Sequence, residues 1–420
     1  MKPLLQKYLI ILIMLCGATI TRASDNDSIV HWGGSVYVNP GRALVMDNVQ
    51  KKYQVNKKNL SFGAELHHVD LPQDSDAFAS DYGYPTLSFG VKYSINHGIT
   101  MHRRPDVDAW PGLHEVDYDS HLGNTVSFYG SFTRPFFRTN RWEADYVINA
   151  GVGYSHTKYD KNKNVDNELI GARWLIYFGG RLQLSYQMTR DWGVRAGLEY
   201  WHLSNGALNR PNKGLNVVGP SIALVYQPYY KDIIHGKAPK TKEHFEKYLY
   251  MNVTAGVGAK ALLEEWNYTQ YDAKEGDPDY RTDHFKKYLA YTVQTDLMYR
   301  YARRWASGAG IDVCYGTYSD RVKEIDQAKG VDVPHSPWSL GASIKHQVFY
   351  QNLSMAVSLG YYFYREMGEH AKAVDKPYYE KIGIQYMIPK LGVAVGAMVK
   401  AHFSKADLTE LVVSVPIRLR

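Results

Sequence analysis

The stretch WGVRAGLEYWHLS, residues 192–204, indicates the fold class because its apolar and polar residues alternate. The apolar residues occupy the even positions Trp192, Val194, Ala196, Leu198 and Tyr200. The positions between them are small or charged: Gly193, Arg195, Gly197 and Glu199. A period of two residues is typical of a β-strand with one apolar and one polar face. The same alternation recurs in 86–95, 143–156 and 352–363, so we predict an all-β protein.

Strand length and connection length then favour a membrane barrel. About sixteen strand candidates of roughly ten residues can be counted, which is the length that crosses a bilayer at a tilt. Short joins at 136–142, 187–193 and 388–392 alternate with long polar ones at 96–121 and 262–284. Short turns at one end and long loops at the other are typical of outer-membrane β-barrels. A soluble β-sandwich also alternates and remains the alternative fold.

The N-terminus and the cysteines agree with export. Residues 1–23 have the pattern of a secretory signal peptide, in which Lys2 and Lys7 flank the start, an apolar run follows, and Ala23 offers a cleavage site. Removal of this segment leaves Cys314 as the single cysteine, so an intramolecular disulfide is excluded. The rest contains nothing near the ~20 continuous apolar residues of a transmembrane helix. We therefore expect the chain to cross the bacterial outer membrane with strands.

The chain divides into two halves. A basic linker at 229–245 separates 24–228 from 246–420, and each half holds about eight strand candidates. The ends of the two halves are similar in sequence, YWHLSNGAL at 200–208 and KAHFSKADL at 400–408. This similarity indicates a duplication with a degenerate second copy. Two tandem barrels of eight strands and one wide barrel of about sixteen both remain open. Growth by hairpin duplication favours the single wide barrel.

Three polar residues share the parity of the apolar face near one rim. His202 and Ser204 continue the even positions of their strand, and Asn216 shares the parity of Val218 and Ile222 on the next strand. Polar groups turned toward hydrocarbon are costly, so their presence indicates function. An imidazole beside a hydroxyl can take the hydroxyl proton while the oxygen attacks an acyl carbonyl.

The segment HLSNGALNRPNKGLN, residues 202–216, resembles the signature of the outer-membrane lipid A 3-O-deacylase (acyloxyacyl hydrolase) family, His-x-Ser-Asn followed by Asn-x-Gly. The resemblance is strongest over 199–226 and extends loosely over 30–228. It implies an eight-stranded barrel that hydrolyses an ester-linked hydroxyacyl chain of lipid A on its lipid-facing surface, without a cofactor. By the same resemblance, His202 is the base and Ser204 the nucleophile. The oxyanion hole is then formed by Asn205, Gly206 and Asn212.

Residue 216 departs from the pattern of that family. Its best-known members carry a glutamate there, which completes a Ser-His-Glu triad, whereas this chain has Asn216. An asparagine can accept a hydrogen bond from the imidazole Nδ1–H but cannot balance an imidazolium charge. In the second copy, His402 and Ser404 have the parity of the polar face, so we expect no second active site there.

The basic residues suggest how lipopolysaccharide is held. Arg210 and Lys213 lie in the loop that carries Asn212, and we expect them to contact the lipid A phosphates. The net charge of +7 says little by itself. Histidines at irregular spacing predict no metal site, and no nucleotide-binding or nucleic-acid-binding module is visible. The sequence leaves the oligomeric state open.

Two functions from different classes follow. The first is an outer-membrane lipid A deacylase, a carboxylic ester hydrolase in which Ser204 forms an acyl-enzyme. The second is a non-catalytic barrel, either a porin-like channel or a structural protein. The intact Ser-Asn-Gly and Asn-x-Gly elements favour the enzyme, whereas Asn216 and the doubled length favour the alternative.

Overall fold

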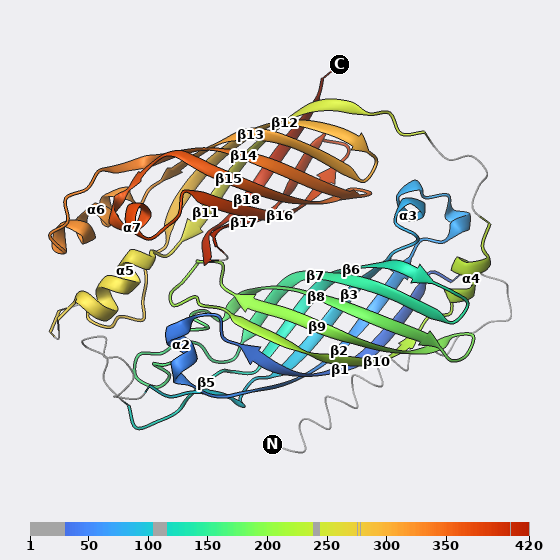
Figure 1. The fold of residues 1–420 in the computed structure, drawn as a ribbon, viewed down its shortest axis with the longest axis horizontal. Coiled ribbons are helices and arrows are strands. Elements are labelled where there is room, and N and C mark those ends of the chain that lie inside the picture. The colour runs from blue at the N-terminus through green and yellow to red at the C-terminus, as the bar shows by residue number, and fades with distance from the viewer. Residues whose placement is uncertain are drawn as a thin grey trace. The chain divides into compact units, whose positions relative to one another are not determined.

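The computed structural model describes residues 30–103, 116–237, 244–274, 276–277, 279–403 and 405–419. The expected signal peptide and Ser404 lie outside the described residues. The described chain is built almost entirely of long antiparallel strands, with short helices in the connections (Figure 1). None of these helices is long and apolar enough to cross a membrane.

The first barrel closes in the order β1-β10-β9-β8-β7-β6-β3-β2, and β2 pairs with β1 to complete the ring. Its strands are β1 (Trp32–Leu44), β2 (Gln54–Val69), β3 (Thr86–Ile95), β6 (Thr125–Arg138), β7 (Trp142–Ser155), β8 (Trp174–Gln187), β9 (Trp192–Ser204) and β10 (Leu215–Tyr226). Two short strands, β4 (Ile99–Met101) and β5 (Ser120–His121), extend one end of β2. The short helices are α2 (Asn48–Tyr53), η1 (Pro72–Asp74), α3 (Ala77–Asp81) and α4 (Tyr230–His235).

The second barrel closes in chain order from β11 to β18. Its strands are β11 (Tyr248–Lys260), β12 (Tyr288–Ala302), β13 (Trp305–Gly316), β14 (His335–Tyr350), β15 (Leu353–Met367), β16 (Tyr378–Ile388), β17 (Val393–His402) and β18 (Lys405–Arg418). The connections carry α5 (Leu263–Asn267), the π-helical turn η2 (Tyr268–Asp272), α6 (Ser319–Ala328) and α7 (Gly368–Ala373).

Two closed barrels of eight strands correct the preference for one wide barrel of sixteen. In the first half, β1 pairs with β10 and also with β2, so both of its edges are used within that half. In the second half, β11 likewise pairs with both β12 and β18. A strand has only two edges, and closure leaves no unpaired edge through which a wider ring could form. The chain therefore uses the tandem arrangement.

The barrels have polar interiors and apolar outer surfaces, the reverse of a soluble β-protein. On β9 the side chains of Arg195 and Glu199 are buried inside the barrel, whereas Leu198 is 58% exposed on the outer wall. Inside the first barrel, Lys92 pairs with Glu199 at 2.7 Å between Nζ and Oε1. Inside the second, Lys381 pairs with Asp312 at 2.6 Å. An apolar outer wall around a polar interior is the arrangement of an outer-membrane barrel and excludes the soluble sandwich.

The two ends of each barrel differ in their connections. In the first barrel, segments 45–53, 96–124, 156–173 and 205–214 join strands at one end. At the other end, 139–141 and 188–191 are short turns, and the β2–β3 connection 70–85, which carries η1 and α3, is longer. In the second, 261–287, 317–334 and 368–377 contrast with the turns at 303–304, 351–352 and 389–392. Outer-membrane barrels have short periplasmic turns and longer extracellular loops. The β9–β10 connection therefore lies at the extracellular end.

Candidate active site

The ends of β9 and β10 bring together the polar residues singled out in the sequence. His202 and Asn216 are directly opposite each other in the β9–β10 ladder. Ser204 is the last residue of β9 and, by the alternation of that strand, lies on the same outer face as His202. The side chains that point inward from β9, such as Glu199, have the opposite parity. The register thus puts His202, Ser204 and Asn216 at one place on the outer wall.

The side chain of Asn216 joins two aromatic side chains of β9. Its Oδ1 lies 2.8 Å from Nδ1 of His202, and it accepts a hydrogen bond of 2.6 Å from the Tyr200 hydroxyl. Because an amide oxygen can only accept, the proton of the neutral imidazole sits on Nδ1. The lone pair on Nε2 is then available to take a proton from another group. The arrangement makes His202 competent as a general base.

Tyr200 is the residue of this group that sequence reasoning missed. The signal was present, since Tyr200 precedes His202 by two positions and so shares its face. An aromatic residue near a barrel rim is ordinarily interpreted as part of the interfacial girdle, which hid its second role. The hydrogen bond to Asn216 becomes visible only when β9 and β10 are paired.

The imidazole of His202 is confined from two directions. The ring of Phe178 on β8 lies 4.7 Å from it, centroid to centroid, at an interplanar angle of 37°. Gly214 passes on another side, with a φ of +76° and so little room that a Cβ there would lie 2.5 Å from His202 Cε1. A glycine at 214 therefore serves both the backbone turn and the close approach to the ring. These contacts limit the rotation of the base.

Ser204 follows His202 by two positions on the same face of β9. Residues two apart on a strand are separated by roughly 7 Å along the backbone, a gap that a long imidazole side chain can narrow. Ser204 is 9% exposed. Within the described residues no hydrogen bond joins its hydroxyl to His202. Catalytic hydrogen bonds are often long before substrate binds, so this spacing does not conflict with a nucleophilic role.

The β9–β10 loop is held by its own asparagines. The Asn205 backbone N–H donates to Asn212 Oδ1 at 2.9 Å, and the Asn209 backbone N–H donates to Asn205 Oδ1 at 3.2 Å. Immediately after Ser204, Gly206 and Ala207 have left-handed φ values of +60° and +70°. The side chains of Asn205 and Asn212 thus shape the turn beside Ser204. Their stabilisation of an oxyanion stays a prediction.

The two predicted phosphate-binding cations have different surroundings. Lys213 Nζ lies 2.6 Å from Glu168 Oε2 and 3.0 Å from Asp47 Oδ1. Burial lowers the pKa of Lys213, but these carboxylates outweigh it and hold the pKa above its ordinary value. Arg210 is a buried residue of the same loop. Contact of either residue with phosphate stays a prediction.

An ion-pair network extends from Lys213 across the extracellular rim of the first barrel. Arg103 lies 3.0 Å from Asp166 and 3.1 Å from Glu168, so Glu168 connects Arg103 with Lys213. With the Lys213–Asp47 pair, four connections of the barrel are tied together in this way. In the described ranges, no three His, Cys, Asp or Glu side chains gather closely enough to hold a metal ion.

Comparisons with known proteins identify both halves of the chain. The family model described as lipid A 3-O-deacylase (PagL) matches residues 87–224, which include the whole β9–β10 site. A second model, acyloxyacyl hydrolase, C-terminal domain, matches residues 249–418. The second half, whose sequence showed only a degenerate echo, is thus itself a domain found in acyloxyacyl hydrolases. No curated protein matches the chain by sequence.

The solved structures that match the chain are remote. The toluene transporter TodX of Pseudomonas putida is 10% identical, with 96% of this chain and 90% of that chain covered and a TM-score of 0.18. A porin mutant of Rh. blastica is 7% identical, with 92% and 99% covered and a TM-score of 0.16. The two family models together span most of the chain: it belongs to the lipid A 3-O-deacylase family and is an outer-membrane ester hydrolase that deacylates lipid A.

Proposed function

We propose that this lipid A deacylase works by a serine-hydrolase mechanism in which Ser204 is the nucleophile, His202 the general base and Asn216 the residue that orients the base. The observation that carries the proposal is the 2.8 Å contact between His202 Nδ1 and Asn216 Oδ1 on the outer wall. It supports a neutral imidazole whose Nε2 is free to accept the Ser204 proton.

The reaction proceeds in two steps. As Ser204 Oγ attacks the acyl carbonyl, its proton moves to His202 Nε2, and the carbonyl oxygen becomes an oxyanion. Collapse of this intermediate breaks the ester bond, and the departing sugar oxygen takes the proton from the imidazolium. Water then attacks the acyl-Ser204 ester while His202 Nε2 takes one of its protons. Collapse of this second intermediate breaks the bond to Ser204 Oγ, the imidazolium returns the proton to that oxygen, and a free fatty acid leaves.

Asn216 limits one part of this cycle. A carboxylate both orients the imidazole and stabilises the imidazolium charge, whereas an amide supplies orientation and a dipole only. The Tyr200 hydroxyl supports the orienting role, because its 2.6 Å bond to Oδ1 holds the Asn216 side chain toward the imidazole. We therefore propose an active enzyme that is slower than one with glutamate at this position.

The remaining assignments concern the oxyanion and the substrate. We propose that the Gly206 backbone N–H, with Asn205 and Asn212, stabilises the oxyanion, which their position in the turn directly after Ser204 supports. Arg210 and Lys213 would face the lipid A phosphates. For Lys213, a phosphate would join the network that already holds Asp47 and Glu168. The chain would reach the outer membrane through a signal peptide cleaved after Ala23.

The experiment is mass spectrometry of lipid A from cells that make the protein or its Ser204→Ala variant. The protein should remove the mass of one hydroxyacyl chain, and the variant should leave lipid A unchanged while inserting into the outer membrane in equal amount. Deacylation by the variant at the same rate would rule out Ser204 as the nucleophile. Unchanged lipid A in both strains, with folded barrel present, would contradict the catalytic proposal altogether.

A further inference from the structure

Two cations lie side by side on the lipid-facing wall of the first barrel, and the deacylation mechanism does not use them. Arg42 on β1 and Lys58 on β2 are directly opposite each other in the β1–β2 ladder. Both have the exposed parity of their strands, whereas their neighbours Ala43 and Asn59 are buried inside the barrel. Directly opposite side chains on one face have Cβ atoms about 4.5–5.5 Å apart. The wall therefore presents two adjacent positive charges.

This pair has no counter-charge among the residues that the structure describes. Within those residues, neither the Arg42 nor the Lys58 side chain makes a hydrogen bond or an ion pair. The outward residues next to them carry no charge: Pro40 and Leu44 on β1, Asn56 and Leu60 on β2, and Val218 on β10. Like charges directly opposite each other destabilise a sheet, and a cation on a lipid-facing wall costs more the deeper it lies. An anion held between the two side chains offsets both costs.

The pair is on the same face of the barrel as the candidate active site. Arg42 is opposite Val218 on β10, which in turn is opposite Tyr200 on β9. Tyr200 precedes His202 by two positions on that outward face. Neighbouring strands lie about 4.8 Å apart, so Arg42 is roughly 10 Å across the wall from β9. Arginine and lysine side chains extend along an apolar surface and bring their charged ends to the polar boundary of the membrane. One lipid head group can thus contact both the pair and the active site.

These two cations differ from the ones that the sequence singled out for phosphate. Lys213 already has two carboxylates within 3.0 Å, and Arg210 is a buried residue. Arg42 and Lys58 are both exposed on the outer wall. The segment 42–58 contains five Lys and Arg residues and a single acidic residue, so the electrostatic potential around the pair favours an anion.

We infer that Arg42 and Lys58 bind a phosphate of lipid A and so position its head group beside Ser204. The guanidinium offers a planar pair of N–H donors and the ammonium a compact charge, and together they hold one phosphate from two sides. The inference rests on lipid A as the substrate of the proposed mechanism and adds a contact for its head group. An ordinary phospholipid also carries a phosphate, and the test separates the two lipids.

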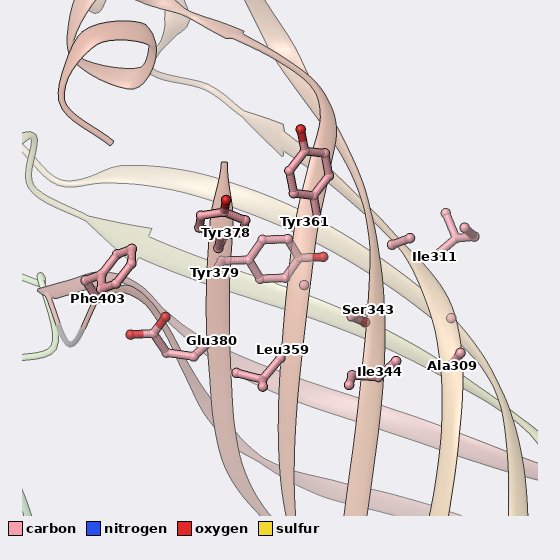
Figure 2. A pocket seen from close by; sticks show the side chains of 13 residues that line it. Ala309, Ile311, Ser343, Ile344, Leu359, Tyr361, Tyr378, Tyr379, Glu380 and Phe403 are labelled. Carbon is pink, nitrogen blue, oxygen red and sulfur yellow. The ribbon is translucent and has the colours of Figure 1, made fainter. Parts of the chain in front are cut away.

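The outer wall of the second barrel provides a contrasting surface. It contains a groove of about 910 Å³, formed by β13 to β16 and the turn after β17 (Figure 2). The small residues Ala309 and Ala342 lie there beside Ile344, which is 63% exposed. Among the described residues that line the groove, none is Lys or Arg. An apolar groove accepts any acyl chain and selects no head group, so it serves as a control surface in the test.

The test measures lipid binding to the full chain carrying Ser204→Ala, purified in a non-ionic detergent, by native mass spectrometry. The ligands are bisphosphorylated lipid A, the same lipid A after its phosphates have been removed, and phosphatidylglycerol. Exchange of Arg42→Gln together with Lys58→Gln should lower the affinity for bisphosphorylated lipid A at least about tenfold, because two charge-assisted contacts are lost. The affinity for phosphate-free lipid A should stay within about twofold, and that for phosphatidylglycerol, whose phosphodiester has a single charge, should fall less than about threefold.

The matched control removes the same charge from the same end of the barrel. Lys161 and Lys163 are exposed in the 156–173 connection. Exchange of both for glutamine should change each affinity by less than about twofold, since charges in solvent away from the ligand are screened. Ala342→Trp, which fills the groove of the second barrel, should leave the preference for phosphorylated lipid A unchanged.

A second variant guards against a folding defect. Lys58→Glu puts a carboxylate opposite Arg42, and opposite charges in that position stabilise paired strands. The barrel should therefore fold at least as well as the parent, while binding of bisphosphorylated lipid A falls as far as in the glutamine variant.

Three results would overturn the inference: a loss of the same size in the Lys161 and Lys163 control, the same loss for phosphate-free lipid A, or the same loss for phosphatidylglycerol. The binding readout needs no hydrolysis, so a protein that holds phosphorylated lipid A through this pair without cleaving it would contradict the catalytic mechanism alone. In the active protein, the glutamine variant should raise KM and leave kcat unchanged, because the contact is made equally in the ground state and the transition state.

Discussion

The ends of β9 and β17 each carry a histidine. His202 and His402 occupy equivalent positions of the two copies but lie on opposite faces of their barrel walls. His202 lies on the outer face and bonds to Asn216 on the neighbouring strand. His402 lies inside the second barrel, where its Nδ1 donates to the backbone carbonyl of Tyr378 at 2.9 Å and its Nε2 lies 3.6 Å from Asp407. The apolar positions are even on β9 and odd on β17, and a shift of one residue transfers a side chain to the other face.

This difference shows that what the histidine of the His-x-Ser motif can contact depends on which face of the barrel wall it occupies. An outward histidine can reach lipid that lies against the wall, whereas an inward one is enclosed by polar side chains such as Asp407 and cannot meet an acyl ester in the membrane. The second copy also has Lys405, the first residue of β18, at the position where the first copy has Asn205. Asn205 belongs to a loop that its own hydrogen bond to Asn212 holds. Similar sequence motifs thus place the proposed base on the outer face of the first barrel and a histidine with polar partners inside the second.

The largest expected difference is between two single variants, His202→Ala and His402→Ala. His202→Ala should lower the rate of hydroxyacyl release by on the order of 10³-fold or more, since loss of a general base also disables the nucleophile. His402→Ala should leave the rate within about twofold of the parent in protein that inserts normally. Release of hydroxy fatty acid from purified lipid A in detergent measures both. Equal losses in two folded variants would mean that the face of the wall does not decide function.

Changes at Asn216 come next. Asn216→Leu should lower the rate by about 10²-fold to 10⁴-fold, because the imidazole loses the acceptor that fixes its tautomer. Asn216→Glu should raise the rate about tenfold, because a carboxylate also stabilises the imidazolium. The same release assay applies, with equal insertion into the membrane as the control. A glutamate variant no faster than the parent would show that residue 216 does not serve the base electrostatically.

The smallest expected effect is that of Tyr200→Phe. Removing one hydroxyl from the Tyr200–Asn216–His202 chain should lower kcat about twofold to tenfold, the size of one neutral hydrogen bond. KM should stay unchanged, because the hydroxyl acts on the base through Asn216 and not on the substrate. In an Asn216→Leu background the same change should have no further effect. Additive losses in the double variant would separate Tyr200 from the catalytic residues.

Alternation along single strands was enough to predict much of this protein. The period of two indicated strands, assigned an outer face to β9 and β10, and put His202, Ser204 and Asn216 on it. These features are local, because the parity of a residue is set by its own strand. The resemblance of residues 202–216 to the deacylase signature then named the chemistry, and the family model over 87–224 agrees with it.

Only the tertiary structure decided which strand edges pair. Closure of β1 with β2 and β10, and of β11 with β18, makes two barrels where the sequence favoured one. The same pairing sets Asn216 opposite His202, adds Tyr200 to the site and aligns the small residues that open the groove on the second barrel. Pairing joins residues distant along the chain, so it depends on the energy of whole interfaces between strands, which no single segment encodes.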